Sequence, residues 1–185
     1  MSKTYPQIDE ALAAFIRAQK MFFVATAPLS GEGSVNVSPK GYDSLVLIDD
    51  HTVAWLDLGG SGAETLAHVR ENGRITLMFC TFEGPANILR LYGQGRAVAF
   101  EDPGFAELKA LFPTFDRARA IVVVTVTRIS DSCGWGVPFY DYKGEREQLR
   151  RHVDHRPFDE WAKRRYEANA VSIDGLPALE RPGAD

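Results

Sequence analysis

A run typical of a β-strand passes through glycines straight into a predicted helix at residues 55–65, which read WLDLGGSGAET. Glycines let a backbone approach a ligand closely, and the free N–H groups at a helix N-terminus attract anions, commonly phosphates. The hydroxyls of Ser61 and Thr65 add further donors. The segment therefore indicates a phosphate-binding turn, although a capped helix after a tight turn explains the same residues without a ligand.

Two common nucleotide-binding motifs are excluded at this segment. A Walker loop needs Gly-Lys-Ser/Thr after its glycines, and none follows here. The dinucleotide-binding motif fails because Thr65 stands where its last glycine belongs. The sequence therefore supports neither a nucleoside triphosphatase nor a Rossmann-type dehydrogenase.

A second stretch, residues 35–42, brings a lysine to the end of a predicted strand. Its valines alternate with polar residues, which is typical of a half-buried strand. Pro39 removes a hydrogen-bond donor from the ladder, so the strand should bulge or lie at a sheet edge. There the ammonium group of Lys40 either meets an anion or points into solvent, as most lysines do.

Arg90 shares one face of another predicted strand with Ile88 and Tyr92. A charge between large apolar side chains is costly unless it is paired. We therefore expect Arg90 either to meet a carboxylate or to reach a ligand.

Residues 132–142 read SCGWGVPFYDY and hold four aromatic side chains among glycines and a proline. Such a loop either covers the sheet as core or forms one wall of a pocket for a flat ligand, and we favour the first interpretation. Cys133 has no histidine nearby in the sequence to activate it as a nucleophile.

Metal and hydrolytic chemistry have no visible residue set. His152 and His155 stand three residues apart in a charged run, and two ligands do not make a metal site. No Ser-His-Asp spacing, paired-carboxylate motif or Cys-x-x-Cys pair stands out. The sequence predicts no metal and identifies no catalytic residue.

The elements that must position these residues are mostly strands. Alternating patterns and β-branched or aromatic content predict seven of them, and their short connections require mostly antiparallel pairing. An amphipathic helix is predicted at residues 9–20, before the first strand. The strands are expected at residues 21–27, 34–38, 44–48, 52–58, 74–82, 88–100 and 120–129.

Two helices are expected to interrupt the strands. One starts at a capping box, residues 61–64, and ends near Gly73. The other has Asp102 as its N-cap and Pro103 as its first residue, and Pro113 ends it.

A charged helical tail is expected from residue 145 to about residue 168. The stretch after it, residues 172–185, contains two prolines and is expected to trail over the surface. The apolar side chains that give the tail one packing face are Phe158, Trp161, Ala162 and Tyr166.

One domain of the β-dominated α+β class is the resulting expectation. A chain of 185 residues suits a single domain, residues 1–185, with a charged helical extension from about residue 143. Seven antiparallel strands with edges to hide favour closure into a small barrel, or a sandwich that nearly closes, with helices over its ends.

Charge and composition exclude some partners. The chain has 21 basic and 25 acidic residues, a net charge of −4, and no basic cluster, so nucleic acid is not an expected partner. Two cysteines outside any metal-type pairing suit a reducing compartment. The first residues lack an export signal, and no apolar run approaches the ~20 residues that span a bilayer. We therefore expect a cytoplasmic protein without a membrane segment.

The order of these parts resembles the pyridoxamine 5′-phosphate oxidase-like family, the FMN-binding split β-barrels, over roughly residues 8–129. The resemblance implies a six- or seven-stranded antiparallel split β-barrel with peripheral helices. Residues 132–142, with the continuation Gly144-Glu145-Arg146, look like those of a bacterial subgroup without an assigned substrate. The family resemblance rests on the opening helix, on FFVAT and VNVSPKG at residues 22–26 and 35–41, on the turn at residues 59–65, and on RITLMF and LYGQGRA at residues 74–79 and 91–97.

The resemblance also implies a function, a cofactor and a partner. Family members are typically homodimers with two FMN sites at the subunit interface. The resemblance therefore implies a homodimeric flavoprotein that binds FMN and acts as an oxidoreductase on an unknown small molecule. The residues that it assigns to the cofactor are Ser38, Lys40, Gly41, Asp57, Leu58, Ser61, Gly62, Thr65, Asn87, Arg90 and Trp135.

Most of these residues are implied to hold FMN from within one subunit. By similarity, residues 38–41 lie along the flavin, with Lys40 near its phosphate or its ring edge. Ser61, Gly62 and Thr65 are implied to hold the phosphate.

The other three are implied to act at the flavin ring or across the interface. Asn87 and Arg90 correspond to a strand that approaches the flavin from the partner subunit. Trp135, in a region beyond the secure resemblance, is expected to cover the isoalloxazine ring.

Two departures from the family pattern argue against vitamin B6 oxidation. Authentic pyridoxamine phosphate oxidases carry Arg-Lys after the serine at the helix start, whereas this chain has Gly62-Ala63 and loses two cations. The C-terminal arginine and histidine that hold the substrate phosphate in those oxidases have no convincing counterpart. The open alternatives are a deazaflavin or a haem in the same barrel, a flavin-binding or sensing module without turnover, and a structural dimer whose turn binds nothing.

Overall fold

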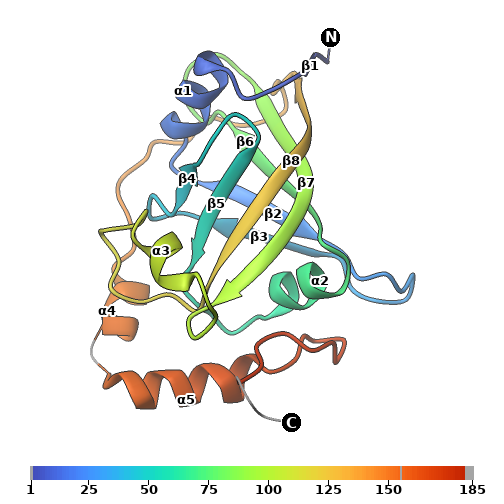
Figure 1. The fold of residues 1–185 in the computed structure, drawn as a ribbon. Coiled ribbons are helices and arrows are strands. Elements are labelled where there is room, and N and C mark those ends of the chain that lie inside the picture. Colours follow the sequence, from blue (N-terminus) through green and yellow to red (C-terminus); the bar gives the residue numbers. More distant parts are fainter. Residues whose placement is uncertain (1, 155, 182–185) are drawn as a thin grey trace.

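One antiparallel sheet of eight strands forms the body of the computed structural model, which describes residues 2–154 and 156–181 but no side chains at residues 152–154 (Figure 1). The strand order is β3-β2-β6-β7-β8-β5-β4, and β1 pairs with β8 beside this path. The strands are β1 (Thr4–Tyr5), β2 (Phe22–Thr26), β3 (Asn36–Lys40), β4 (Leu45–Leu47), β5 (Thr52–Asp57), β6 (Arg74–Cys80), β7 (Ile88–Ala99) and β8 (Ala120–Ser132).

The two edges of this sheet come close together. β3 and β4 stand at opposite ends of the strand order, yet only residues 41–44 connect them, so the sheet has to curl until its edges meet. The described strands include no pairing of β3 with β4, which leaves the barrel split along this line. The predicted β-dominated α+β fold with an antiparallel split barrel is therefore confirmed.

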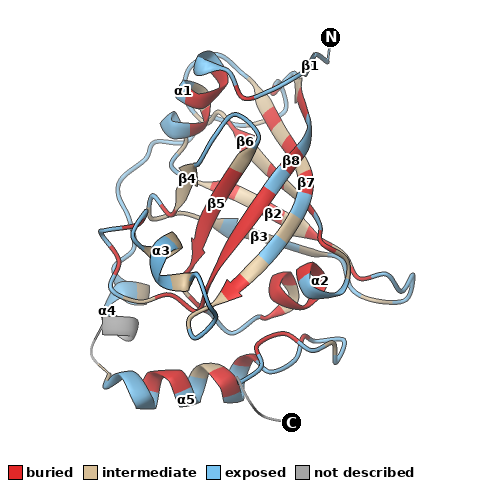
Figure 2. Cartoon of the chain, viewed as in Figure 1, coloured by how far each residue is buried: buried red, intermediate tan, exposed pale blue. Residues whose placement is uncertain are grey.

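The interior of the curled sheet is filled with apolar side chains. Val53 and Trp55 of β5, both fully buried, belong to this core. Leu56 and its neighbours on the other face of β5 pack against Phe112 and Phe115 instead. Burial on both faces explains why residues 53–56 of β5 are all apolar, and Figure 2 shows buried residues along both β5 and β8.

All seven predicted strands are present, and β1 is the one that the sequence did not predict because it has only two residues. β7 and β8 shift register between Tyr92 and Gly93. A Cβ atom at Gly93 would lie 2.3 Å from the carbonyl oxygen of Thr125. Only glycine therefore allows the two backbones to approach this closely at the irregularity.

Helices α1 (Glu10–Ala18) and α2 (Glu64–Asn72) lie close to their predicted positions. The backbone N–H of Leu12 donates to the side chain of Asp9 at 2.8 Å and caps α1. α2 ends at Gly73 as predicted, but its predicted capping box is wrong: Ala63 precedes the helix and no side chain caps it. The carboxylate of Glu64 is turned away and accepts the N–H of Ile173 at 3.3 Å.

Helix α3 (Phe105–Lys109) begins later than predicted. Gly104, not Asp102, is its N-cap, so the predicted cap and the predicted first position of Pro103 are wrong. The reason is that Asp102 closes the turn after β7. Its carboxylate accepts the backbone N–H of Ala99 at 2.8 Å.

The charged tail forms two helices, α4 (Gln148–Asp154) and α5 (Phe158–Asn169), instead of the single predicted one. Pro157 stands immediately before α5, and proline cannot continue a helix from the preceding residues. Three of the four predicted packing residues, Trp161, Ala162 and Tyr166, are buried, whereas Phe158 is 47% exposed. In the described part of the chain, no helix is long and apolar enough to cross a membrane.

The stretch after α5 does not trail over the surface as predicted. Ala178 and Leu179 are 2% and 3% exposed and belong to the core of the barrel. Their N–H groups donate to the carbonyl oxygens of Ala170 and Asn169 at 2.8 and 3.0 Å. These contacts fasten the end of α5 to the domain.

Candidate functional site

A cavity of about 300 Å³ lies at the split of the barrel, where β3, the turn after β5 and the start of α2 come together. Its lining contains eight of the eleven predicted cofactor residues. Tyr42, Ser44, Arg119 and Leu149 also line it, although the sequence did not assign them to a site. The eight predicted residues in its lining are Ser38, Lys40, Gly41, Asp57, Leu58, Ser61, Gly62 and Thr65.

The other three predicted residues do not line this cavity. Asn87 donates its backbone N–H to the hydroxyl of Thr81 at 2.8 Å. The guanidinium of Arg90 donates to the hydroxyl of Ser132 at 2.9 Å, so its described partner is neither a carboxylate nor a ligand. Trp135 is 87% exposed.

The aromatic segment around Trp135 is not core, so the favoured interpretation of residues 132–142 is wrong for this chain. Phe139 and Tyr140 are 80% and 62% exposed. Gly134, Gly136 and Pro138 lie in the turn and irregular backbone that follow β8. Tyr140 fastens the segment to the sheet, because its ring stacks on Phe82 with centroids 5.5 Å apart and its backbone N–H donates to the carbonyl oxygen of Phe82 at 3.1 Å.

A buried ion pair holds the turn after β5. Arg119 Nη2 lies 2.8 Å from Asp57 Oδ2, and neither side chain is more than 5% exposed. Asp57 Oδ1 accepts the backbone N–H of Gly59 at 3.1 Å. Gly59 has φ +82°, and a Cβ atom there would lie 3.3 Å from Arg119, so glycine is needed at this position.

The electrostatics of this pair keep Asp57 ionised. Burial alone would raise the pKa of its carboxyl group. The charges of Arg119 and Lys40, with the hydrogen bonds from Arg119 and Gly59, outweigh burial and hold the pKa below its ordinary value. Asp57 therefore lines the cavity with both carboxylate oxygens already engaged by the protein.

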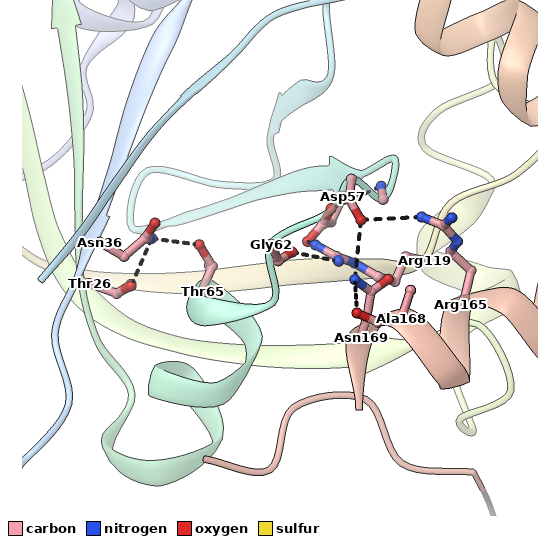
Figure 3. Close-up of polar contacts among 11 residues, drawn as sticks. Thr26, Asn36, Asp57, Gly62, Thr65, Arg119, Arg165, Ala168 and Asn169 are labelled. Carbon is pink, nitrogen blue, oxygen red and sulfur yellow. Dashed lines mark hydrogen bonds and ion pairs between the residues drawn. The ribbon is translucent and has the colours of Figure 1, made fainter. Parts of the chain in front are cut away.

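The backbone of the glycine turn is fixed through its carbonyl oxygens (Figure 3). Arg119 Nη1 donates to the carbonyl of Gly62 at 2.8 Å. Asn169 Nδ2 and Arg165 Nη1, both from α5, donate to the carbonyl of Gly60 at 3.1 and 3.3 Å. The backbone N–H groups of residues 60–62 have no acceptor within the residues that the structure describes.

Two side chains on β3 face the same cavity. β3 is an edge strand, which confirms the position predicted from Pro39. The hydroxyl oxygen of Ser38 is buried and has no hydrogen-bond partner among the described atoms. Lys40 lies close enough to Asp57 to influence its carboxyl group, and no described carboxylate forms an ion pair with its ammonium group.

A polar network runs behind the start of α2. Asn36 Nδ2 donates to the hydroxyls of Thr65 at 3.0 Å and Thr26 at 3.1 Å, as Figure 3 shows. The hydroxyl of Thr26 lies 3.0 Å from Nδ1 of the fully buried His68. Thr65 thus accepts from Asn36 and keeps its own hydroxyl proton for another acceptor.

The stability of the protein should decrease as the pH falls below about 6.5, the ordinary pKa of histidine. Burial lowers the pKa of His68, against the raising effect of the nearby carboxylates of Asp174, Glu71 and Glu64. Below pH 6.5 the histidine therefore binds a proton in the unfolded chain but stays neutral in the folded protein, which favours unfolding. Urea unfolding at pH 7.5 and pH 5.5 should show this loss, and His68→Gln should show a smaller one. An equal loss in both proteins would contradict the assignment.

The donors around the cavity fit the anionic tail of a ligand. Free N–H groups of the turn, the unpartnered hydroxyl of Ser38 and the ammonium of Lys40 all border it. Glu64 also lines it and opposes an anion. The volume of about 300 Å³ stands at the lower end of the range for small-molecule sites, so a large ligand needs a further surface.

The described side chains include no group of three or more His, Cys, Asp or Glu residues that could bind a metal ion. His152 and His155 lie outside the side chains that the structure describes. Cys80 is buried and Cys133 is exposed, and neither forms a disulfide.

The sequence did not predict the three side chains that hold the glycine turn, which are Arg119, Arg165 and Asn169. Arg119 carries a weak signal, because it stands between alanines at the start of a predicted buried strand, where an unpaired charge is costly. Arg165 and Asn169 carry none, since they lie 105 and 109 residues after the glycine that they contact.

Comparisons with known proteins agree with this architecture. The sequence pattern of pyridoxamine 5′-phosphate oxidase matches residues 8–133. The pyridoxamine 5′-phosphate oxidase family protein ustO of Aspergillus flavus is 35% identical over 192 residues, which cover 95% of this chain and 77% of that protein. Because this relative is fungal, the bacterial subgroup expected from residues 132–146 stays a prediction.

Solved structures show the likeness in fold. A variant of HupZ from Group A Streptococcus superposes with a TM-score of 0.56 at 24% identity, over 68% of this chain and 99% of that one. A Lactobacillus delbrueckii structure named after pyridoxamine 5′-phosphate oxidase superposes with a TM-score of 0.52 at 14% identity, over 69% of this chain and 98% of that one.

Proposed function

The chain belongs to the pyridoxamine 5′-phosphate oxidase family of flavin-binding split barrels, and from this premise we propose that it binds FMN and acts as an oxidoreductase on a small molecule. The observation that supports this proposal most strongly is the cavity at the split of the barrel. It combines unpaired backbone N–H groups at a helix start with the orphaned hydroxyl of Ser38 and the charge of Lys40. These are the donors that a phosphate monoester needs.

Each of these residues has a separate task in the proposal. The N–H groups of residues 60–62 and the hydroxyls of Ser61 and Thr65 bind the phosphate. Lys40 adds a positive charge beside it, and Ser38 donates to the ribityl chain or the ring edge. When bound, the flavin supplies the electron-transfer chemistry itself, so the protein needs to position the substrate and exclude water but needs no acid–base pair.

We also propose that two copies of the chain complete the site. The cavity alone is small, and Asn87, Arg90 and Trp135 lie away from it in their own chain. The large exposure of Trp135 and its aromatic neighbours supports a surface that a second copy covers. In this arrangement those three residues act on the flavin of the partner subunit.

Vitamin B6 oxidation is not the activity that we propose. Gly62 and Ala63 replace the two cations that bind the FMN phosphate in authentic pyridoxamine phosphate oxidases, and a counterpart of their substrate-phosphate residues is lacking. We propose a different small organic substrate on the same cofactor.

The direct test is an absorption spectrum of the purified protein with mass analysis of the small molecule released on denaturation. Flavin bands and released FMN are the expected result. A colourless protein that takes up no added FMN would contradict the proposal, and a deazaflavin or haem spectrum would replace FMN by that cofactor. Reduction of the bound flavin by NADH or NADPH, followed by reoxidation, separates an oxidoreductase from a binding module.

The double change Ser61→Ala with Thr65→Ala should weaken FMN binding about tenfold, because it removes two hydroxyl donors while the backbone donors stay. Quenching of flavin fluorescence on titration with protein measures the effect. Ser30→Ala, in the exposed loop before β3, is the matched control and should bind as the wild type does. Unchanged FMN retention in the double variant would remove the phosphate role of both hydroxyls.

A further inference from the structure

Helix α5 contacts the glycine turn although it lies outside the part of the chain that defines the family. The family pattern ends at residue 133, whereas α5 spans Phe158–Asn169. The structure nevertheless places two of its side chains on one backbone carbonyl of the turn (Figure 3). The family pattern does not include this contact, because both donors lie in the C-terminal extension that follows the matched residues.

Two donors converge on that carbonyl. Asn169 is fully buried, and its Nδ2 lies 3.1 Å from the carbonyl oxygen of Gly60. Arg165 Nη1 lies 3.3 Å from the same oxygen. The buried end of α5 is itself held by the backbone bond from Leu179 to the carbonyl of Asn169. The position of Gly60 is therefore set by a fastened helix and not by the turn alone.

Peptide geometry passes this constraint to the cavity. The carbonyl of Gly60 and the N–H of Ser61 belong to one planar trans peptide unit, in which they point in opposite directions. A carbonyl held toward α5 therefore turns the N–H of Ser61 away from α5. Ser61 lines the cavity, whereas no residue of α5 does, so the cavity and α5 lie on different sides of the turn. The N–H of Ser61, which points away from α5, is therefore directed toward the cavity. Arg119 acts in the same way on the peptide unit between Gly62 and Ala63, through the carbonyl of Gly62.

The same residues bring positive charge to the turn. Gly62 and Ala63 carry none, yet the guanidinium groups of Arg119 and Arg165 both donate to carbonyls of this turn. The charge of Arg119 is balanced by Asp57, whereas the ion pairs described for α5 do not include Arg165. Arg165 therefore contributes a net positive charge behind the turn.

We propose that α5 contributes to the binding of the cofactor. Asn169 and Arg165 are positioning residues: they hold the Gly60 carbonyl and thereby orient the Ser61 N–H toward the phosphate of FMN. This inference rests on the proposed FMN function. The inference adds to that function a role of the helical extension in phosphate recognition.

Affinities for FMN and for riboflavin, which lacks the phosphate, test the proposal because only FMN reports on the turn. Asn169→Leu removes the neutral donor while keeping the branching and the number of side-chain heavy atoms, and Arg165→Ala removes the charged donor. Each should lower the affinity for FMN about tenfold and change the affinity for riboflavin less than about twofold. Lys163→Ala is the matched control, because it removes the same charge from an exposed position of the same helix.

Several outcomes separate this proposal from the proposed function. If the wild type binds neither flavin, or binds both equally, the phosphate site itself is refuted and the inference with it. If the wild type prefers FMN but both variants keep that preference, only the role of α5 is refuted. Parallel losses for FMN and riboflavin would also refute it, since they indicate a general structural effect. Arg165→Lys, which retains a donor, should recover most of the FMN preference, and it tests the proposal even if Asn169→Leu does not fold.

Discussion

Asp57→Asn is expected to lower the free energy of unfolding by about 3–5 kcal/mol, because it leaves the guanidinium of Arg119 buried without its counter-charge. The pair is 2.8 Å apart and almost inaccessible to solvent, so water cannot replace the lost carboxylate. Urea unfolding at pH 7 measures the change. Since the pKa of Asp57 is lowered in the folded state, the difference from wild type should persist down to pH 5 and shrink only below about pH 4.

A double variant separates the electrostatic effect of the ion pair from the effect of the volume that its two side chains fill. Asp57→Leu combined with Arg119→Met replaces both charges by apolar groups, and it should recover most of the stability lost in the single variants. It should not recover FMN binding, because the bond from Arg119 to the Gly62 carbonyl is also gone. A loss below about 1 kcal/mol in Asp57→Asn would show that the pair does not hold the turn.

Lys40→Gln is expected to reduce the affinity for FMN by tenfold or more, roughly the value of a charge-assisted contact to phosphate. Among the described residues that line the cavity, Lys40 is the one lysine, and none of the described ion pairs includes it, so its charge is available to a ligand. Titration of the protein with FMN at several salt concentrations measures the change. The variant should also show a weaker dependence of FMN binding on salt.

The conservative variant Lys40→Arg is the control and should stay within a few-fold of wild type, because it keeps the charge. Riboflavin provides a second control. If Lys40→Gln weakens riboflavin and FMN equally, Lys40 acts at the ring edge and not at the phosphate. If neither flavin is affected, the lysine has no part in binding.

The fold could be predicted from the sequence because its signals are local. The alternating strands, the opening amphipathic helix and the glycine after α2 each depend on neighbouring residues, and they appear close to their expected positions. The errors arise where a residue has a competing distant or local partner. Asp102 closes the turn after β7 instead of capping α3, and the stretch after α5 enters the core through Ala178 and Leu179.

The site could be predicted only in part for the same reason. The glycine turn and Lys40 carry their chemistry in their own sequence, and the structure brings them to one cavity. The side chains that hold the turn come from the start of β8 and from α5, and nothing in the residues around Arg165 or Asn169 indicates a contact so far away. The aromatic segment around Trp135 was misjudged because apolar content alone does not tell core from an exposed surface.

Because Gly60 and its two partners on α5 lie far apart in the sequence, the ribosome synthesises the glycine turn long before the side chains that hold it. All strands of the barrel, including β8, are translated before α5, whereas the side chains that hold Gly60 follow it by 105 and 109 residues. Closing so long a loop costs more chain entropy than forming a local contact, so we expect these contacts to form late in folding. A nascent chain that has been synthesised only as far as β8 therefore lacks the side chains that hold Gly60, and under the proposed function FMN is expected to bind after α5 has been made.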